Sequence, residues 1–181
     1  MATETEIKLA VADVRAARRL LRGAGFRISR RRVFERNTIF DNKTTLRRRR
    51  SLLRLREAGG TATLTYKGAP APGRHKSREE IETTVEDARA MRTVLERLGF
   101  QATWRYEKYR TEYRLDRGAG MATLDETPVG VYLELEGSPR WIDRMARALG
   151  FSHGDYITAS YGRLYMEHCE RQGLARGEMV F

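Results

Sequence analysis

Cysteine and histidine are scarce in this chain of 181 residues. Its only cysteine is Cys169, which has no second cysteine with which to form an internal disulfide. The histidines are His75, His153 and His168, and their scattered positions do not match the ligand spacing of a zinc site. The composition therefore excludes a disulfide-stabilised scaffold and disfavours a Cys/His metal site.

Long hydrophobic segments are also missing. No stretch approaches the run of about 18 apolar residues that a membrane span requires. Glu4 and Glu6 stand where a secretory signal would begin its apolar segment. Hydrophobic residues make up 40% of the chain, which is too many for a disordered protein and enough for one globular domain. We therefore expect a soluble, cytoplasmic protein of one domain, with no membrane partner.

Acidic residues are outnumbered by basic ones. The chain has 35 Lys and Arg residues against 24 Asp and Glu residues, which gives a formal net charge of +11 at pH 7. An excess of this size favours a polyanionic partner, such as a nucleic acid, a phosphate-rich metabolite or an anionic surface. Which of these it is depends on where the charges lie along the chain.

One helical pattern occurs three times. The three segments are residues 13–26, 87–100 and 138–151. Each begins with Asp or Ser, which favour a helix N-cap, and each ends in Gly-Phe, where glycine suits a left-handed C-terminal turn. Apolar residues recur at helical spacing between these ends, as Met91 and Leu95 do. We interpret the segments as amphipathic helices that pack on the rest of the domain, and we expect a further helix at about residues 158–172.

Between the helices, charged and apolar residues alternate with the period of two that is typical of β-strands. The alternating segments are residues 4–9, 52–56, 61–67, 78–82, 104–115, 121–125 and 131–136. Because the helices need the apolar faces for packing, we expect the charged faces on the opposite side of the sheet. Seven or eight such strands predict an α+β fold, an antiparallel β-barrel with a charged interior flanked by the helices. An open sheet with one hydrated face is the alternative.

The charged face combines both signs. Its acidic residues are Glu4, Glu6, Glu80, Glu82, Asp125, Glu134 and Glu136. Its basic residues are Lys8, Arg54, Arg56, Lys67, Arg78, Lys108, Arg110 and Arg114. Carboxylates suit a hard divalent cation, and Arg and Lys suit phosphate oxygens. A nucleic-acid surface would carry few acids on its contact face, so the strands favour a small phosphorylated ligand over nucleic acid.

The order of these motifs resembles that of the CYTH proteins, the triphosphate tunnel metalloenzymes. The chain opens with the ExExK motif at Glu4, Glu6 and Lys8. The motifs that follow are RLR at 54–56, TYKG at 65–68, REEIE at 78–82, EKYR at 107–110, LDETP at 124–128 and LELEG at 133–137. ExExK alone is a weak signature, but the ordered series is specific. The chain resembles in particular the CyaB-like class IV adenylyl cyclases, including the Ser160-Tyr161 pair, and thiamine and inorganic triphosphatases are their relatives.

The resemblance implies an eight-stranded tunnel that holds a triphosphate together with Mg²⁺ or Mn²⁺. It implies metal ligands at Glu4, Glu6, Asp125, Glu134 and Glu136. It implies phosphate-binding residues at Lys8, Arg54, Arg56, Lys67, Lys108 and Arg110. Glu80 and Glu82 match a second acidic strand, which holds a second metal ion or orients the basic residues. No general base is assigned.

The resemblance leaves the reaction open. A class IV adenylyl cyclase, which converts ATP to cyclic AMP and pyrophosphate, is the first expectation. A triphosphatase that hydrolyses inorganic tripolyphosphate, thiamine triphosphate or a nucleoside triphosphate is the alternative. A non-catalytic binder of polyphosphate or RNA is a further alternative, which the acidic residues of the tunnel disfavour. A homodimer is left open.

Three further segments have expected structures. We expect one CYTH-like barrel domain over residues 1–172, followed by a frayed tail over residues 173–181. The arginine run at residues 47–50 is expected to be mostly solvated. Residues 68–77, rich in Pro and Gly, are expected to form a mobile loop at the mouth of the barrel.

Overall fold

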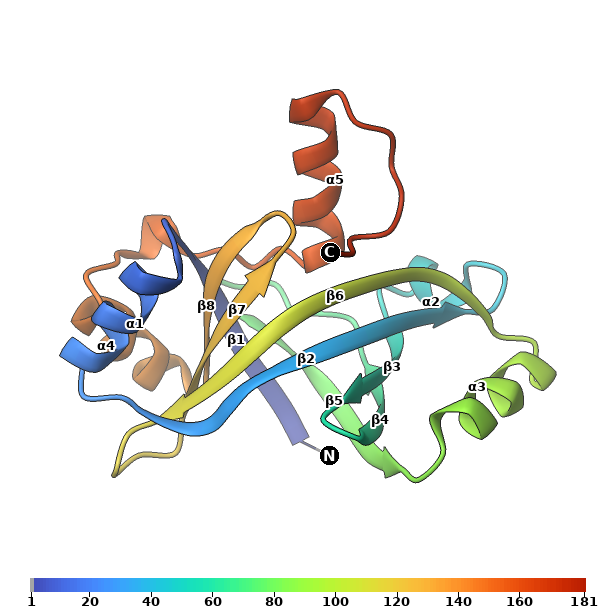
Figure 1. The fold of residues 1–181 in the computed structure, drawn as a ribbon, viewed down its shortest axis with the longest axis horizontal. Helices are drawn as coiled ribbons and strands as arrows, with labels where there is room; N and C mark the ends of the chain where they lie inside the picture. Colours follow the sequence, from blue (N-terminus) through green and yellow to red (C-terminus); the bar gives the residue numbers. More distant parts are fainter. Residues whose placement is uncertain (1) are drawn as a thin grey trace.

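The computed structural model describes residues 2–181. Within these residues, eight strands form a closed barrel in the order β1-β5-β4-β3-β2-β6-β7-β8, and every neighbouring pair is antiparallel (Figure 1). The strands are β1 (Ala2–Val11), β2 (Arg27–Asp41), β3 (Leu52–Ala58), β4 (Thr61–Lys67), β5 (Lys76–Val85), β6 (Gln101–Arg114), β7 (Met121–Thr127) and β8 (Gly130–Glu136). The expected eight-stranded antiparallel barrel is confirmed, and the open sheet is wrong.

The strands alternate between side chains that point into the barrel and side chains that face the helices. On β1, Ile7 is fully buried on the outer face, whereas Lys8 lines the interior. Their partners in register on β8 are Leu135, which is also fully buried, and Glu134, which also lines the interior. The period of two therefore separates an apolar outer face from a charged inner face, as the sequence predicts.

Three helices with the expected pattern cover the outside of the barrel. They are α1 (Val14–Gly23), α3 (Ala88–Arg97) and α4 (Pro139–Ala148). The side chains of Asp13, Asp87 and Ser138 accept hydrogen bonds from the first-turn amides, as N-caps do. Helices α1 and α4 lie next to each other at one end of the barrel and pack against β1, β7 and β8, whereas α3 packs against β3 at the other end (Figure 1).

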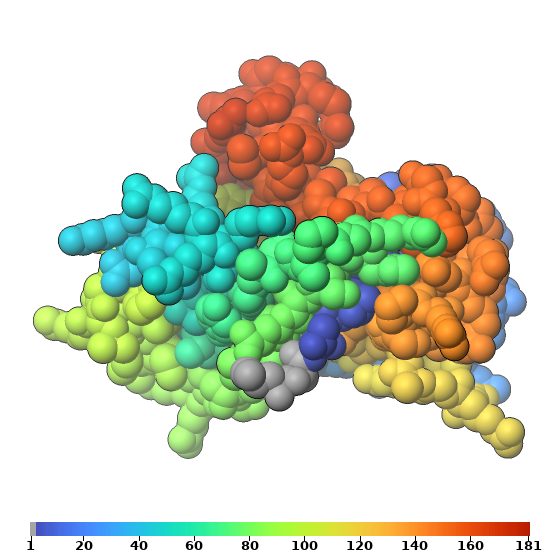
Figure 2. Space-filling model, turned by 180° about the vertical axis from the view of Figure 1, so that it is seen from behind, coloured from blue at the N-terminus to red at the C-terminus, as the bar shows by residue number. Residues whose placement is uncertain are grey.

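In the described part of the chain three helical segments remain, two of them short and one that stands apart from the barrel. They are α2 (Thr45–Arg48), the 3-10 turn η1 (His153–Asp155) and α5 (Tyr161–Gln172). Seen from behind, α5 and the segment after it form a lobe that rises above the barrel (Figure 2). No helix within residues 2–181 is both long enough and apolar enough to cross a membrane.

Strand β2 is the longest strand, and the sequence pattern did not predict it. Its first half contains three consecutive arginines at residues 30–32, which hide any alternation. It pairs with β6 along its length, with register shifts that a simple period of two does not reproduce. Its inward-facing residues include Glu35 and Asn37, both buried. Pairing with β6 therefore determines this strand more than local sequence does.

The end of the chain is ordered against β6, which differs from the expected frayed tail. The Met179 side chain is fully buried. Its backbone amide donates to the Arg105 carbonyl oxygen over 3.1 Å, and its carbonyl oxygen accepts from the Glu107 amide over 2.8 Å. The Phe181 ring packs against Tyr109, with ring centroids 5.2 Å apart. Strand β6 offers both hydrogen-bonding groups and an apolar site, so the last residues are held against it. The composition of the segment alone suggests a frayed tail.

The close approach of β7 to α4 requires glycine at position 120. Gly120 is buried, and a Cβ atom added to it would overlap the ring of Trp141 on α4. Trp141 is itself buried in the core beneath α1 and α4. The indole therefore occupies the space that any larger residue at position 120 would need.

We expect Gly120→Ala to lower the free energy of unfolding by about 1–3 kcal/mol, because the indole must move in a packed core. Gly23→Ala is the matched control, since no atom lies within 4 Å of its added Cβ. The control should be neutral or slightly stabilising because alanine favours a helix. Urea unfolding followed by far-ultraviolet circular dichroism measures both variants, and equal midpoints would show that the Trp141 contact does not constrain position 120.

Candidate active site in the barrel interior

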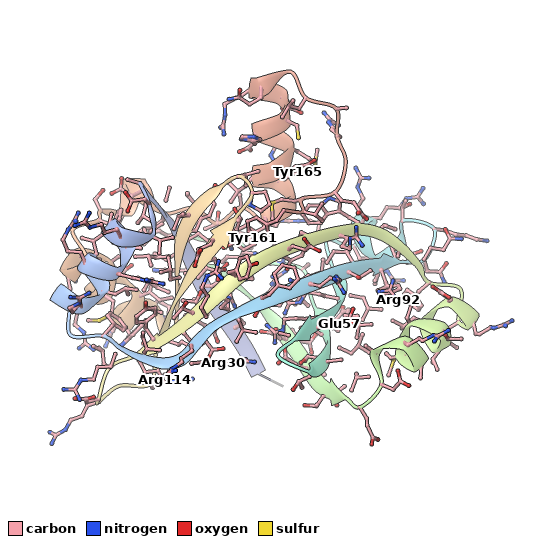
Figure 3. All side chains as sticks on the ribbon, viewed as in Figure 1. Arg30, Glu57, Arg92, Arg114, Tyr161 and Tyr165 are labelled. Carbon is pink, nitrogen blue, oxygen red and sulfur yellow. The ribbon has the colours of Figure 1, made fainter. Side chains whose placement is uncertain are left out.

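A cavity of about 780 Å³ occupies the barrel interior. It extends from Tyr161, the first residue of α5, to Arg30 and Arg114 on β2 and β6 (Figure 3). All the expected site residues except Asp125 line it. The lining ones are Glu4, Glu6, Lys8, Arg54, Arg56, Lys67, Glu80, Glu82, Lys108, Arg110, Glu134 and Glu136. The motifs that are separate in the sequence therefore meet in one charged cavity.

The first group of ion pairs joins β1 to β4 and β5. The Lys67 Nζ atom lies 2.6 Å from both carboxylate oxygens of Glu4 and 3.1 Å from Glu80 Oε1. Arg78 Nε lies 3.5 Å from Glu4 Oε2. Each of these side chains is mostly shielded from solvent, so the opposite charges compensate one another where water is scarce.

The second group surrounds Lys8. Its Nζ atom lies 3.2 Å from Glu134 Oε1 and 3.5 Å from Glu6 Oε1, and Arg110 also donates to Glu134. Burial opposes the charged form of Lys8, but Glu6 and Glu134 raise its pKa above the ordinary value. Burial likewise opposes ionisation of Glu6, but Lys8 and Lys76 hold its pKa well below the usual range. Both signs therefore remain charged near pH 7.

Asp125 lies behind the cavity lining and is completely buried. Its Oδ2 atom accepts from Lys108 Nζ and from the Tyr161 hydroxyl, each over 2.7 Å, and its Oδ1 atom accepts from Arg110 Nε over 2.7 Å. Both oxygens are therefore engaged by this chain's own donors. This placement argues against the metal-ligand role expected for Asp125 and makes it the residue that positions Lys108 and Arg110.

A third group contains the arginines of β3. Arg54 is buried and donates to the Tyr106 hydroxyl over 3.4 Å and to Thr65 Oγ1 over 3.3 Å. Arg56 donates to Glu82 Oε1 over 3.3 Å at a more exposed position. The two guanidinium groups thus stand on the opposite wall from Lys8, across the interior of the barrel.

Several residues in or directly behind the cavity lining were missing from the predicted site. Glu35 was missed because its strand, β2, was not predicted. Its carboxylate lies 3.7 Å from Lys108 Nζ, and although burial raises its pKa, Lys108 and Arg110 lower it to about 2. Lys76 and Tyr106 carried a usable signal, because they stand in phase with Arg78 and Lys108 on strands whose charged faces were already identified.

Glu136 lies where negative charge is in excess. Its carboxyl group is partly buried near Glu4 and Glu80, and its pKa is raised to about 7 by burial first and by those two carboxylates second. Lys67 opposes this shift but is already engaged by Glu4 and Glu80. This end of the cavity therefore lacks positive charge.

The donor chemistry of this region fits Mg²⁺ or Mn²⁺. Both ions prefer carboxylate oxygens, and an excess of negative charge around Glu136 is what a divalent cation would neutralise. Within residues 2–181, no three side chains of His, Cys, Asp or Glu are already arranged to hold a metal ion. The reason is that Glu4, Glu6 and Glu134 face lysine and arginine instead. The residues that could hold a cation are Glu4, Glu6, Glu134 and Glu136.

Aromatic and apolar residues gather at the α5 end of the cavity. Trp104 and Tyr106 stack with ring centroids 5.1 Å apart, and Tyr106 also lies against Tyr161. Ile39 packs against these aromatic residues and also lines the cavity. The cavity therefore has a less polar end beneath α5 and a strongly charged middle.

The family model described as the CYTH domain matches residues 2–161. The chain belongs to the CYTH family. A relative from Methanocaldococcus jannaschii, named "Putative adenylate cyclase MJ0240", is 29% identical over 170 residues, which cover 87% of this CYTH chain and 95% of the relative.

Solved structures share the fold. A protein from Vibrio parahaemolyticus, described as a putative adenylate cyclase, has a TM-score of 0.77 at 20% identity and covers 89% of this CYTH chain and 96% of its own. A Hippeastrum protein has a TM-score of 0.67 at 20% identity, covering 96% and 97% of the two chains. Its description reads "Putative adenylyl cyclase HpAC1 from Hippeastrum reveals a dominant triphophatase activity". These structures confirm the barrel fold, and the family model confirms the family predicted from the motifs.

The raised pKa of Glu136 predicts a pH-dependent stability of the metal-free CYTH barrel. Its ordinary pKa is 4.5 and its pKa in the folded chain is about 7. The protonated form therefore stabilises the fold at low pH, and this contribution is lost as the pH rises through 7. We expect Glu136→Gln to raise the melting temperature more at about pH 8 than at about pH 5. A gain that stays the same at both pH values would mean that Glu136 is not crowded by other carboxylates.

The burial of Asp125 predicts a large effect on the stability of the CYTH barrel. Asp125→Asn removes the negative charge between Lys108 and Arg110, and we expect it to lower the free energy of unfolding by about 3–5 kcal/mol. Asp116→Asn is the matched control, because Asp116 pairs with Arg27 over 3.3 Å at an exposed site. The control should change the free energy of unfolding by at most about 1 kcal/mol. Chemical denaturation measures both, and a small effect of Asp125→Asn would remove its positioning role.

Proposed function

We propose that this chain is a divalent-metal-dependent enzyme that acts on a triphosphate held in the barrel interior. The observation that carries the proposal is the pairing of lysines and arginines with carboxylates throughout one cavity. Lys67 with Glu4 and Lys8 with Glu134 are examples of such pairs. A triphosphate and a divalent cation carry opposite charges, as the two halves of each pair do.

Binding would exchange one set of ionic contacts for another. The triphosphate would take Lys8, Lys67 and Arg54 as its partners, and the carboxylates left behind would take the metal ion. When the triphosphate binds the basic residues, their carboxylate partners become free to bind the metal ion. When the metal ion binds the carboxylates, the basic residues become free to bind the triphosphate. This mutual requirement also explains why a polyanion binder that works without metal is disfavoured, since the unpaired carboxylates would repel it.

The lining supplies transition-state stabilisation for either family reaction. A bound divalent cation would supply charge neutralisation at the phosphate oxygens. Arg110 and Lys108 are held rigidly by Asp125, so their donors need little reorganisation when negative charge develops. Arg54, held by Tyr106 and Thr65, offers a second fixed set of donors from the opposite wall.

Cyclisation of ATP is the first candidate reaction. In it the ribose 3′ hydroxyl attacks the α-phosphorus, the bond to the β-phosphate oxygen breaks, and pyrophosphate leaves. The aromatic end of the cavity beneath α5 supports this candidate, because Trp104 and Tyr106 offer stacking surfaces for a base. The name of the M. jannaschii relative supports it as well.

Hydrolysis of a triphosphate is the second candidate. Here water attacks the terminal phosphorus and orthophosphate leaves, so neither a base nor a ribose has to be placed. The charged residues in the middle of the cavity support this candidate, because they are sufficient to bind phosphates and a metal ion without any contact to a base or a ribose. The triphosphatase activity stated for the Hippeastrum structure supports it too.

Product analysis separates the candidates. The purified protein is incubated with ATP or tripolyphosphate and Mg²⁺ or Mn²⁺, and the products are resolved by chromatography. Cyclic AMP with pyrophosphate identifies the cyclase, and orthophosphate identifies the hydrolase. Excess EDTA should abolish either activity. Absence of turnover with every substrate and metal, or full activity in EDTA, would overturn the proposal.

A binding measurement tests whether the triphosphate binds in the barrel or on the outer surface. We expect Arg54→Ala to weaken triphosphate binding about ten- to hundredfold, because it removes a charge-assisted contact in a buried site. Arg49→Ala is the matched control, because Arg49 is exposed in the turn after α2. Calorimetric titration with tripolyphosphate and Mg²⁺ measures both variants. Equal losses at the two positions would place binding on the surface and not in the barrel.

A further inference from the structure

A second hollow lies on the outside of the barrel, bordered by α3, β2, β6 and the C-terminal segment. Its volume of about 490 Å³ is in the range of small-molecule sites. Its charged lining consists of Arg36, Arg89, Arg92, Arg105, Glu57 and Glu178. We call this hollow the outer groove. Arg36 is also paired with Glu107 over 3.6 Å, so four arginines against three glutamates leave the groove with an excess of one positive charge.

Arg92 is held in the groove by two contacts. It projects from α3, donates to Thr38 Oγ1 over 3.3 Å, and lies over the ring of Phe40 at 5.7 Å from its centroid. Its nearest acidic partner, Glu57, is 3.9 Å away, which is a long ion pair (Figure 3). The guanidinium group is therefore held in place while much of its hydrogen-bonding capacity is unused.

Arg105 lines the outer groove from β6, as Arg92 does from α3. Its Nη2 atom lies 2.7 Å from Glu178 Oε2, at a half-exposed position. Its Nε atom is buried, and no atom of the described residues accepts a hydrogen bond from it. A buried donor without a partner is costly, so a shift of the half-exposed Arg105 side chain that brings its guanidinium group to a ligand acceptor would be favourable.

The outer groove is separate from the barrel cavity. Arg36 and Thr38 alternate with the inward-facing Glu35 and Asn37 along β2, so their side chains leave the strand on the opposite face. Trp104 lines both hollows and forms part of the wall between them. A ligand in the outer groove would therefore not compete directly for the phosphate-binding residues of the tunnel.

We propose that the outer groove binds a small molecule that carries one or more phosphate groups. A phosphate monoester carries about −1.5 to −2 charges near neutral pH, so it would be attracted by the positive charge that remains in the groove. The forked donors of Arg92 and Arg105 suit phosphate oxygens in a bidentate geometry, which lysines would not provide. The proposal does not depend on which reaction the barrel cavity performs.

Equilibrium dialysis with labelled pyrophosphate tests the proposal on the full-length protein in EDTA. The tunnel variant Arg54→Ala serves as background, so that the outer groove is observed with binding in the barrel weakened. We expect this variant to bind one pyrophosphate at a site that Arg92→Ala with Arg105→Ala weakens by about ten- to hundredfold. Orthophosphate and AMP, titrated in the same way, separate recognition of a single phosphate from recognition of a chain or a nucleotide.

Two further variants make the result decisive. Arg89→Glu changes an exposed residue at the start of α3, so it should weaken pyrophosphate binding without affecting folding. Arg97→Ala changes an exposed arginine of the same helix that does not line the outer groove, so it should leave binding unchanged. Binding that survives the Arg92 and Arg105 changes, or that falls as much with Arg97→Ala, would overturn the proposal.

Discussion

Compensation of buried charge across neighbouring strands is the constraint on which the rest of this structure depends. The barrel encloses lysines, arginines and carboxylates that would each be costly to bury alone. Neighbouring strands place opposite charges side by side, and Asp125 is the most deeply buried example, with Lys108, Arg110 and Tyr161 around it. The helices outside can then bury the apolar faces in an ordinary core, because the charges are satisfied within the barrel.

Compensation is incomplete at one place, and this incompleteness is chemically useful. Around Glu136, carboxylates outnumber the available cations, so one proton is retained to about pH 7. A fully neutralised interior would be more stable but would have no reason to attract a metal ion. One half of the candidate site is therefore rigid, because Asp125 holds Lys108 and Arg110 in place. The other half, around Glu136, has an excess of negative charge that a bound cation can neutralise.

Much of this arrangement was predictable from the sequence, for a physical reason. Alternation in segments such as residues 131–136 is a local property, and the barrel follows once the apolar faces need helices to cover them. The depth of a carboxylate is not local: Asp125 and Glu134 have similar neighbours along the chain, yet only Glu134 reaches the cavity. Strand β2 and the docking of Met179 were missed for the same reason, since β6 determines both.

Strands β2 and β6 line both the barrel cavity and the outer groove. The inner faces of β2 and β6 present Arg30, Lys108 and Arg110 to the barrel cavity, while their outer faces present Arg36 and Arg105 to the groove. Both hollows are built from arginine-rich stretches of the same ribbon. The net charge of +11 is thus divided between an interior that is nearly balanced and an exterior that is not.

The position of β1 has a consequence for how the chain is synthesised and folded. β1 is hydrogen-bonded to β5 on one side and to β8 on the other. Among the eight strands of the barrel, β1 is synthesised before the others, and its second edge stays uncovered until residues 130–136 pair with it and the barrel closes. Such long-range pairing is slow to form, and an uncovered strand edge invites association with other chains. Glu4, Glu6 and Lys8 place a charge at every second position of β1. These charges make the uncovered edge less prone to associate with other chains before β8 pairs with it.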